Sequence, residues 1–296
     1  MFFNTILATA SIAGLAVAAP FPSGDVAAVS RALKAYISHG PNYQPNRTEP
    51  AGARVLEAGE TVTSSVAVTS INDNDGIGGG TDSYTMYWGD GSAAAGWPSI
   101  DQWVSFEDMF NNNKVVMRTS CEGIQDHYGN SVSDDSEDEI GKIWDAIEQV
   151  AQETFVDHRF ILATIMQESG GCVRVSTTNY GVRNPGLMQD HDGDATCNSD
   201  IAPYTVQTPC PPDVITQMVR DGTAGTASGD GLANCINQSG ASDASAFYKA
   251  ARIYNSGSIA ASGNLQDGIA THCYSSDIAN RLTGWVQAPH GCTLDG

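Results

Sequence analysis

The chain has 296 residues, 41% of them hydrophobic, and its 14 Lys and Arg against 34 Asp and Glu give a formal net charge of −20. This length suffices for one large domain, or for one domain with an extension. A nucleic-acid binder needs basic side chains to neutralise phosphates, and anionic membranes repel so acidic a chain, so neither partner is expected.

The first 19 residues have the features of a secretory signal peptide. They carry no charged side chain and end in small residues, so cleavage is expected after Ala18 or Ala19. No second apolar run approaches this length, and the mature protein is therefore expected to be secreted and soluble. Two glycosylation acceptors, Asn46 and Asn237, agree with secretion.

The seven cysteines fit an oxidising destination, and their odd number leaves one thiol outside any pairing within the chain. Sequence alone does not give the pairing. We expect at least two disulfides to join cysteines within residues 172–273, where they would stabilise long loops.

Residues 20–83 are rich in Ala, Gly, Ser, Thr and Asn, which predicts a low-complexity extension or linker without a function of its own. Within it, 25–37 could form a short helix and 61–71 a strand. Residues 84–120 differ, because they contain several closely spaced aromatic side chains. These are Trp88, Trp97 and Trp103. Such side chains need a surface to pack on or a ligand to stack against, and packing on the main domain is the expectation.

Helical spacing of apolar residues begins after residue 133 and predicts one mainly α-helical domain over 121–296, stapled by disulfides. Helices are expected over 136–154, 157–169, 210–222, 242–257 and 275–285. Ser136 and Glu139 form a capping box at the start of the first helix. The second helix is apolar nearly all round and should therefore be buried at the centre of the domain. Gly222 is expected just past the end of the third.

Glu168 stands at the end of this second helix, where a carboxylate is unfavourable. The helix C-terminus carries partial negative charge, and apolar surroundings remove water, so both disfavour the ionised form. The pKa of Glu168 is therefore expected to rise, which suits a general acid that protonates a glycosidic oxygen. The alternative is an exposed glutamate at the helix edge, as most glutamates are.

Two further motifs follow in the chain, Gly-Leu-Met-Gln at 186–189 and Tyr-Asn at 254–255. The order Glu-Ser, Gly-Leu-Met-Gln, Tyr-Asn resembles the lytic transglycosylase (SLT) domains and goose-type lysozymes of glycoside hydrolase family 23. The chain is also similar to secreted fungal proteins with an SLT-like domain, from about residue 84 to the end. The resemblance implies a lysozyme-like α-helical fold with a cleft for β-1,4-linked N-acetylated glycans.

The resemblance also implies roles for individual residues. It makes Glu168 the catalytic acid and Ser169 its neighbour in the motif. Met188 and Gln189 would line the floor of the cleft. Tyr254 would form a hydrogen bond near the acid. In the same motif, Asn255 would contact an acetamido or hydroxyl group of the sugar.

One departure from the family concerns the second carboxylate. Goose-type lysozymes place an aspartate two residues after Gly-Leu-Met-Gln, where it helps to activate water for inversion. Here that position is His191, which we count among the substrate-binding residues, and it is flanked by Asp190 and Asp192. A one-residue shift of the loop could bring either aspartate to the far side of the sugar, so both are candidate catalytic residues.

The sequence thus predicts a secreted, monomeric glycosidase that cleaves the β-1,4 bond between N-acetylmuramic acid and N-acetylglucosamine in peptidoglycan. Hydrolysis is favoured over lytic transglycosylation, because an extracellular enzyme that degrades foreign wall gains nothing obvious from anhydro ends. A lysozyme-like enzyme acting on chitin or chitosan, and a glycan-binding protein without catalysis, stay open as alternatives.

No cofactor or metal is expected. The six histidines show neither H-x-x-x-H nor H-E-x-x-H spacing. The acidic runs at 73–76 and 190–194 invite a calcium interpretation, but an EF-hand loop needs glutamate in its twelfth position, and neither run has it.

Overall fold

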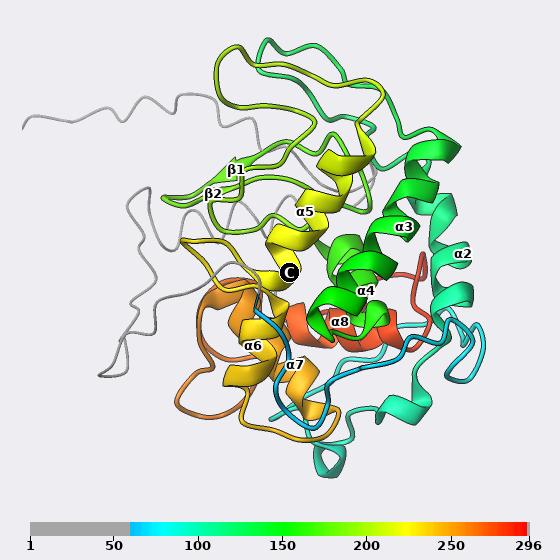
Figure 1. Cartoon of the computed structure of the whole chain (residues 1–296). Helices are drawn as coiled ribbons and strands as arrows, with labels where there is room; N and C mark the ends of the chain where they lie inside the picture. Colours follow the sequence, from blue (N-terminus) through cyan, green and yellow to red (C-terminus); the bar gives the residue numbers. More distant parts are fainter. Residues whose placement is uncertain (1–59, 295–296) are drawn as a thin grey trace, which may run out of the picture.

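The computed structural model describes residues 60–294, which form a mainly helical fold (Figure 1). Its α-helices are α2 (Phe106–Met117), α3 (Glu137–Thr154), α4 (His158–Glu168), α5 (Pro212–Ala224), α6 (Leu232–Gln238), α7 (Ser245–Ser256) and α8 (Tyr274–Leu282). Two short 3₁₀ turns, Ala93–Ala95 and Ile100–Gln102, precede α2. The strands β1 (Thr178–Asn179) and β2 (Arg183–Asn184) pair antiparallel.

The signal peptide expected over 1–19, the helix expected over 25–37 and the acceptor Asn46 lie outside the described residues. Within 60–294, no helix has the length and apolar character needed to cross a membrane.

Helix α3 begins where the sequence predicted it. The Ser136 hydroxyl accepts a hydrogen bond from the Glu139 backbone N–H at 3.2 Å, and the Glu139 carboxylate accepts one from the Ser136 N–H at 2.8 Å. This reciprocal pair satisfies two backbone donors that the first turn of a helix leaves without partners. The buried face of α3, which includes Ile143 and Ile147, packs against α5 and α4.

Helix α4 is the buried central helix that the sequence predicted. Every residue from His158 to Met166 is buried. Asp157 caps its start, because its carboxylate accepts a hydrogen bond from the Arg159 backbone N–H at 2.9 Å. Helices α2, α3 and α8 pack around it, and Figure 1 shows α8 crossing beside it. Glu168 is therefore the last residue of a helix that is buried on nearly all sides.

Two helix predictions need correction. Helix α5 continues through Gly222 and ends at Ala224, because the next residue, Gly225, has a positive φ of 91° that breaks the helix. Gly222 is needed inside the helix because a Cβ there would overlap the side chain of Met188. Regular helices also begin before residue 133, because α2 lies within the aromatic segment and is capped by the Ser105 hydroxyl, which accepts from the Asp108 N–H at 3.1 Å.

Residues 60–83 pack on the helical core, although the sequence predicted only an extension or linker. Val62 and Val66 are 3% and 8% exposed and belong to the main hydrophobic core. The Val62 backbone N–H donates to the Thr154 carbonyl at 2.8 Å, which satisfies a free acceptor at the end of α3. The strand expected over 61–71 is wrong, because this stretch forms turns and irregular backbone.

The aromatic segment packs on the core, as predicted. Trp103 is fully buried and its indole N–H donates to the Tyr248 hydroxyl at 2.9 Å. The ring of Trp97 lies 5.0 Å from that of Tyr248, measured between centroids. Trp88 differs, since it remains 48% exposed.

Three disulfides staple the fold. They join Cys121 to Cys172, Cys197 to Cys210 and Cys273 to Cys292, and Cys235 is buried and not disulfide-bonded. Only the second bridge has both cysteines within 172–273, so the expectation of two bridges inside that range is wrong. Structural disulfides are typical of proteins that fold in an oxidising compartment.

Candidate functional site

Glu168 is the last residue of α4, and its carboxyl group lies among protein atoms with little access to water. Burial raises the pKa of Glu168 to about 7. The hydroxyl of Tyr274, at the start of α8, donates a hydrogen bond to Oε1 and offsets part of that rise. The rise expected from the sequence therefore has burial as its main cause. Because Oε1 already accepts a hydrogen bond from the Tyr274 hydroxyl, we place the proton of a neutral Glu168 on Oε2.

The loop after Glu168 turns on two glycines. Gly170 and Gly171 have φ values of 63° and 89°, a backbone conformation that side chains disfavour. A Cβ on Gly171 would also lie 2.8 Å from Cγ of Met117. The sequence predicted Ser169 to be a substrate-binding residue, but its side chain is buried and closes the helix end. Its hydroxyl donates to the Ile165 carbonyl at 3.1 Å.

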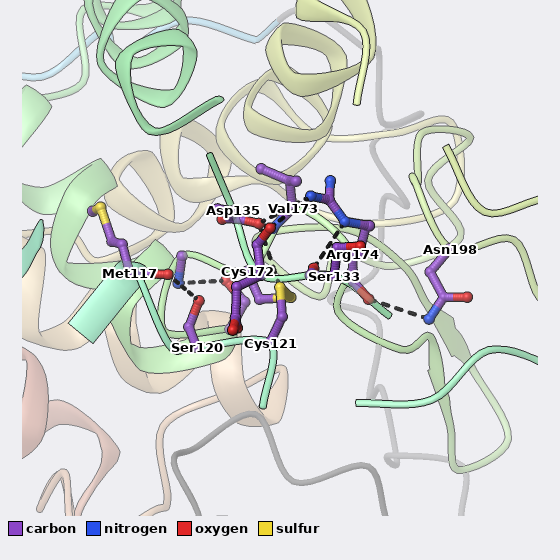
Figure 2. Close-up of a disulfide and its surroundings, with 12 residues drawn as sticks. Met117, Ser120, Cys121, Ser133, Asp135, Cys172, Val173, Arg174 and Asn198 are labelled. Carbon is purple, nitrogen blue, oxygen red and sulfur yellow. Dashed lines mark hydrogen bonds and ion pairs between the residues drawn. A yellow bond between two sulfur atoms is a disulfide. The ribbon is translucent and has the colours of Figure 1, made fainter. Parts of the chain in front are cut away.

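A disulfide anchors this loop from behind. Cys172 is bonded to Cys121, and Figure 2 shows Asp135 beside the bridge, next to Val173 and Arg174. The Asp135 carboxyl accepts a hydrogen bond from the Val173 N–H at 3.2 Å. Burial raises the pKa of Asp135 to about 8, and the positive charge of Arg174 opposes that rise. The segment that follows the candidate acid is thus held by one covalent bond and one buried carboxyl group.

The Gly-Leu-Met-Gln loop is held by Tyr254 of α7. The Tyr254 hydroxyl donates to the carbonyl oxygen of Met188 at 2.8 Å. The sequence led us to expect Tyr254 to bond near the acid, but the hydroxyl that bonds Glu168 belongs to Tyr274. Burial raises the pKa of Tyr254 well above its usual value, and the negative charges of Asp190 and Glu168 raise it further. Tyr254 therefore stays a hydrogen-bond donor.

A cavity of about 230 Å³ lies beside this loop. Four residues of the predicted site line it, namely Gln189, His191, Tyr254 and Asn255, and so does the acidic residue Asp230. Glu168 does not line the cavity. Tyr254 lies between Glu168 and the cavity in its interactions. It lines the cavity, and the charge of Glu168 contributes to the raised pKa of its hydroxyl.

Two larger cavities, of about 590 and 520 Å³, lie elsewhere. The first is lined by α3, α5 and the segment 194–207, and the second by the aromatic segment and the start of α7. Neither is lined by a residue of the three motifs, so we assign the candidate site to the smaller cavity.

No protein-family model, curated protein or solved structure matches the chain.

The two candidate aspartates lie in different environments. Asp190 is only 3% exposed, and burial together with the charge of Asp221 raises its pKa well above the usual value. Such a carboxyl group holds its proton and is a poor general base. The side chain of Asp192 is 47% exposed and lies 3.7 Å from Nε2 of His191. Neither aspartate lines the cavity, whereas Asp230, which no motif indicated, does.

Met188 and Asn255 also differ in their placement. The Met188 side chain is completely buried and does not line the cavity. Asn255 lines the cavity, and its Oδ1 accepts a hydrogen bond from the buried guanidinium of Arg252. Arg252 also donates to the carbonyl of Thr271 at 2.9 Å, which holds the loop that follows α7.

Tyr274 and Asp230 are the site residues that sequence reasoning missed. Tyr274 lies 106 positions after Glu168 and Asp230 lies outside all three motifs. No local spacing signals either residue, because both reach the site through the packing of distant segments.

Proposed function

We propose that the protein is a secreted glycosidase of the lysozyme-like type that cleaves β-1,4-linked N-acetylated glycans, with peptidoglycan as substrate and Glu168 as general acid. One observation carries the proposal. Burial at the end of α4 raises the pKa of Glu168 to about 7, so the carboxyl group keeps a transferable proton near neutrality.

Tyr274 supports this role by orienting the carboxyl group. Its hydroxyl donates to Oε1, which leaves Oε2 as the oxygen that would carry the transferable proton. After the proton has moved to the glycosidic oxygen, the same hydrogen bond stabilises the carboxylate that forms. Burial and the charge of Glu168 raise the pKa of Tyr274 well above its usual value, so the phenol stays a donor.

Sugar recognition falls to the polar side chains of the 230 Å³ cavity. Gln189 and His191 offer donors and acceptors on one wall. The Asn255 carbonyl oxygen is engaged by Arg252, so its amide nitrogen is the atom that would donate to an acetamido or hydroxyl oxygen.

The aspartates favour lytic transglycosylation as a second candidate reaction. Inverting hydrolysis needs a second, ionised carboxylate that activates water across the sugar. Asp190 is buried beside Asp221, and Asp192 does not line the cavity. In lytic transglycosylation the single acid suffices, because ionised Glu168 would next take the proton of the muramyl 6-hydroxyl as the 1,6-anhydro ring closes. Hydrolysis would instead depend on Asp230.

The test is to incubate the full chain with peptidoglycan, chitin and chitosan and to identify the products by mass spectrometry. Glu168→Gln removes the proton, and Glu122→Gln, an exposed glutamate, is the matched control. We expect fragments from peptidoglycan with wild type and the control only. Anhydro ends indicate transglycosylation and reducing ends hydrolysis. Cleavage of chitin or chitosan but not of peptidoglycan would show that the proposed substrate is wrong. Binding without any product would show that the protein binds glycans without cleaving them.

A further inference from the structure

A second group of ionisable side chains lies at the opposite end of α4 from Glu168. His158 begins this 11-residue helix, so about 15 Å of helix separates it from the candidate acid. Its imidazole is 1% exposed and stacks on Phe106, with the ring centroids 4.3 Å apart. Glu148 of α3 and Asp73 of the N-terminal segment both approach the same ring nitrogen.

The distances between these three side chains suit a metal ion. Nδ1 of His158 lies 2.9 Å from Oε1 of Glu148 and 3.7 Å from Oδ1 of Asp73, and the three ligand atoms all lie within 4.8 Å of one another. Zinc–ligand distances of about 2.0–2.1 Å place neighbouring ligand atoms of a tetrahedral site about 3.4 Å apart. The observed separations bracket that value.

Hydrogen bonding within the group does not satisfy its acceptors. One proton on Nδ1 serves only one carboxylate, and it is shared with Glu148. Oδ1 of Asp73 and Oδ1 of Asp75 are covered from solvent, and neither accepts a hydrogen bond within the described residues. A covered carboxylate oxygen without a donor is unfavourable, and a cation is the ligand that would satisfy it.

Arg159, the second residue of α4, is a cationic side chain near this group. It pairs with Asp157 at 2.7 Å and with Oδ1 of Asp75 at 3.4 Å, so its charge is directed to these two carboxylates and not to the Asp73 and Glu148 carboxylates beside Nδ1 of His158.

We propose that Asp73, Glu148 and His158 bind a divalent transition-metal ion of the Zn²⁺ type, with water in the fourth position. The imidazole nitrogen argues against Ca²⁺ and Mg²⁺, which take oxygen ligands. Nε2 of His158 lies 4.0 Å from Oδ1 of Asp75. This carboxylate is placed to accept the Nε2 proton of a metal-bound histidine and so to orient the ring.

The site would tie three separate parts of the chain together. Asp73 belongs to the segment that precedes the aromatic region, Glu148 to the middle of α3, and His158 to the start of α4. Its distance from Glu168 makes it a stabilising site, independent of the proposed glycosidase activity. This site was not predicted from the sequence, because ligands 75 and 10 positions apart form no local motif.

The test uses the full chain, stripped with a chelator and titrated with ZnCl₂ by calorimetry, with metal content and melting temperature measured in parallel. The site variants are Asp73→Asn and Glu148→Gln. The controls are Asp145→Asn and Glu122→Gln, which remove the same charge from exposed positions. We expect one Zn²⁺ per chain and a raised melting temperature for wild type and controls, at least tenfold weaker binding in both site variants, and no displacement by excess Ca²⁺.

Absence of stoichiometric Zn²⁺ binding by wild type, or unchanged binding in both site variants, would overturn the proposal. X-ray absorption of the Zn²⁺-loaded wild type provides a check that does not depend on the folding of any variant. One imidazole among oxygen ligands is expected. A shell with no imidazole, or with two or more, would place the metal elsewhere.

Discussion

The two ends of α4 hold ionisable side chains in different environments. At its C-terminal end the partly buried Glu168 accepts a hydrogen bond from a neutral donor, the Tyr274 hydroxyl. At its N-terminal end His158 is buried against several carboxylates. Glu168, which has no charged partner in the group described, keeps its proton when it is removed from water. The carboxylates around His158 lie close together, and we propose that a cation neutralises them. Burial alone therefore does not decide the chemistry, because the charge of the neighbours decides whether a proton or a metal neutralises the site.

The largest effect is expected from removing the proton at the C-terminal end. Glu168→Gln should lower glycan cleavage by about 100-fold or more, the contribution of a positioned general acid. The amide has nearly the same size, so circular dichroism should show an unchanged fold. Turnover within a few-fold of wild type would sink the catalytic assignment.

Truncation tests the contribution of residues 60–83, whose Asp73 lies beside His158 at the N-terminal end of α4. A chain that starts at residue 60 should fold and cleave normally, whereas one that starts at 84 loses the buried Val62 and Val66. Burying a valine contributes about 1.5–3 kcal/mol, so the shorter chain should be less stable by about 3–6 kcal/mol. Urea unfolding of both chains measures the difference. Equal stability would show that residues 60–83 add nothing to the core.

The same Glu168→Gln variant should be more stable than wild type at alkaline pH. Burial raises the folded-state pKa of Glu168 to about 7, so the folded protein holds this proton more tightly than the unfolded chain. Wild-type stability from this group is present below about pH 4.5 and is lost as pH rises towards 7. Glutamine does not titrate, so the difference in unfolding free energy, variant minus wild type, should increase by about 2–3 kcal/mol between pH 4.5 and 8. A constant difference would contradict the raised pKa.

Tyr274→Phe removes the hydroxyl that donates a hydrogen bond to Glu168 and so isolates the effect of burial on this carboxyl group. The Tyr274 hydrogen bond lowers the pKa of Glu168, so its loss should move the alkaline limb of the pH–rate profile to higher pH. Cleavage at the optimum should fall about tenfold, because the carboxylate that forms in the transition state loses about 1.4 kcal/mol of stabilisation. Tyr128→Phe, at an exposed tyrosine, is the control. A limb that moves to lower pH would reverse the assigned role.

The smallest effect concerns the charge of the whole protein. A net charge of −20 should repel anionic cell walls at neutral pH, and this repulsion weakens towards the isoelectric point near 4.3 and in added salt. Activity on whole walls should therefore be greatest between about pH 4 and 6, where Glu168 is also protonated. Added salt should help more at pH 7 than at pH 4.5. Salt inhibition at neutral pH, with a small soluble glycan as control, would refute the charge argument.

Local patterns predicted the parts of the fold that local interactions determine. The capping box at Ser136 and the apolar run that ends at Glu168 predicted α3 and α4 within a residue or two. Helix α2 was missed because its three consecutive asparagines are poor helix formers, and burial of its apolar face on the core stabilises it instead. Disulfide pairing likewise depends on the tertiary fold.

In the candidate site, too, local sequence predicted some features and tertiary packing determined the others. The position of Glu168 at a buried helix end predicted the direction of its pKa shift. Its partner Tyr274, the cavity residue Asp230 and the carboxylates around His158 could not be predicted, because each reaches its neighbours through tertiary packing and forms no local motif with them. Sequence spacing therefore located the acid, and packing determined its surroundings.

The most direct test of the account is the pKa of Glu168 itself. A carbon-detected NMR titration of the glutamate side-chain carboxyl groups, assigned by the resonance that disappears in Glu168→Gln, measures it without any substrate. The account predicts a midpoint about 7 for this carboxyl group. A midpoint near 4.5, the usual value for glutamate, would contradict the claim that α4 presents a protonated acid.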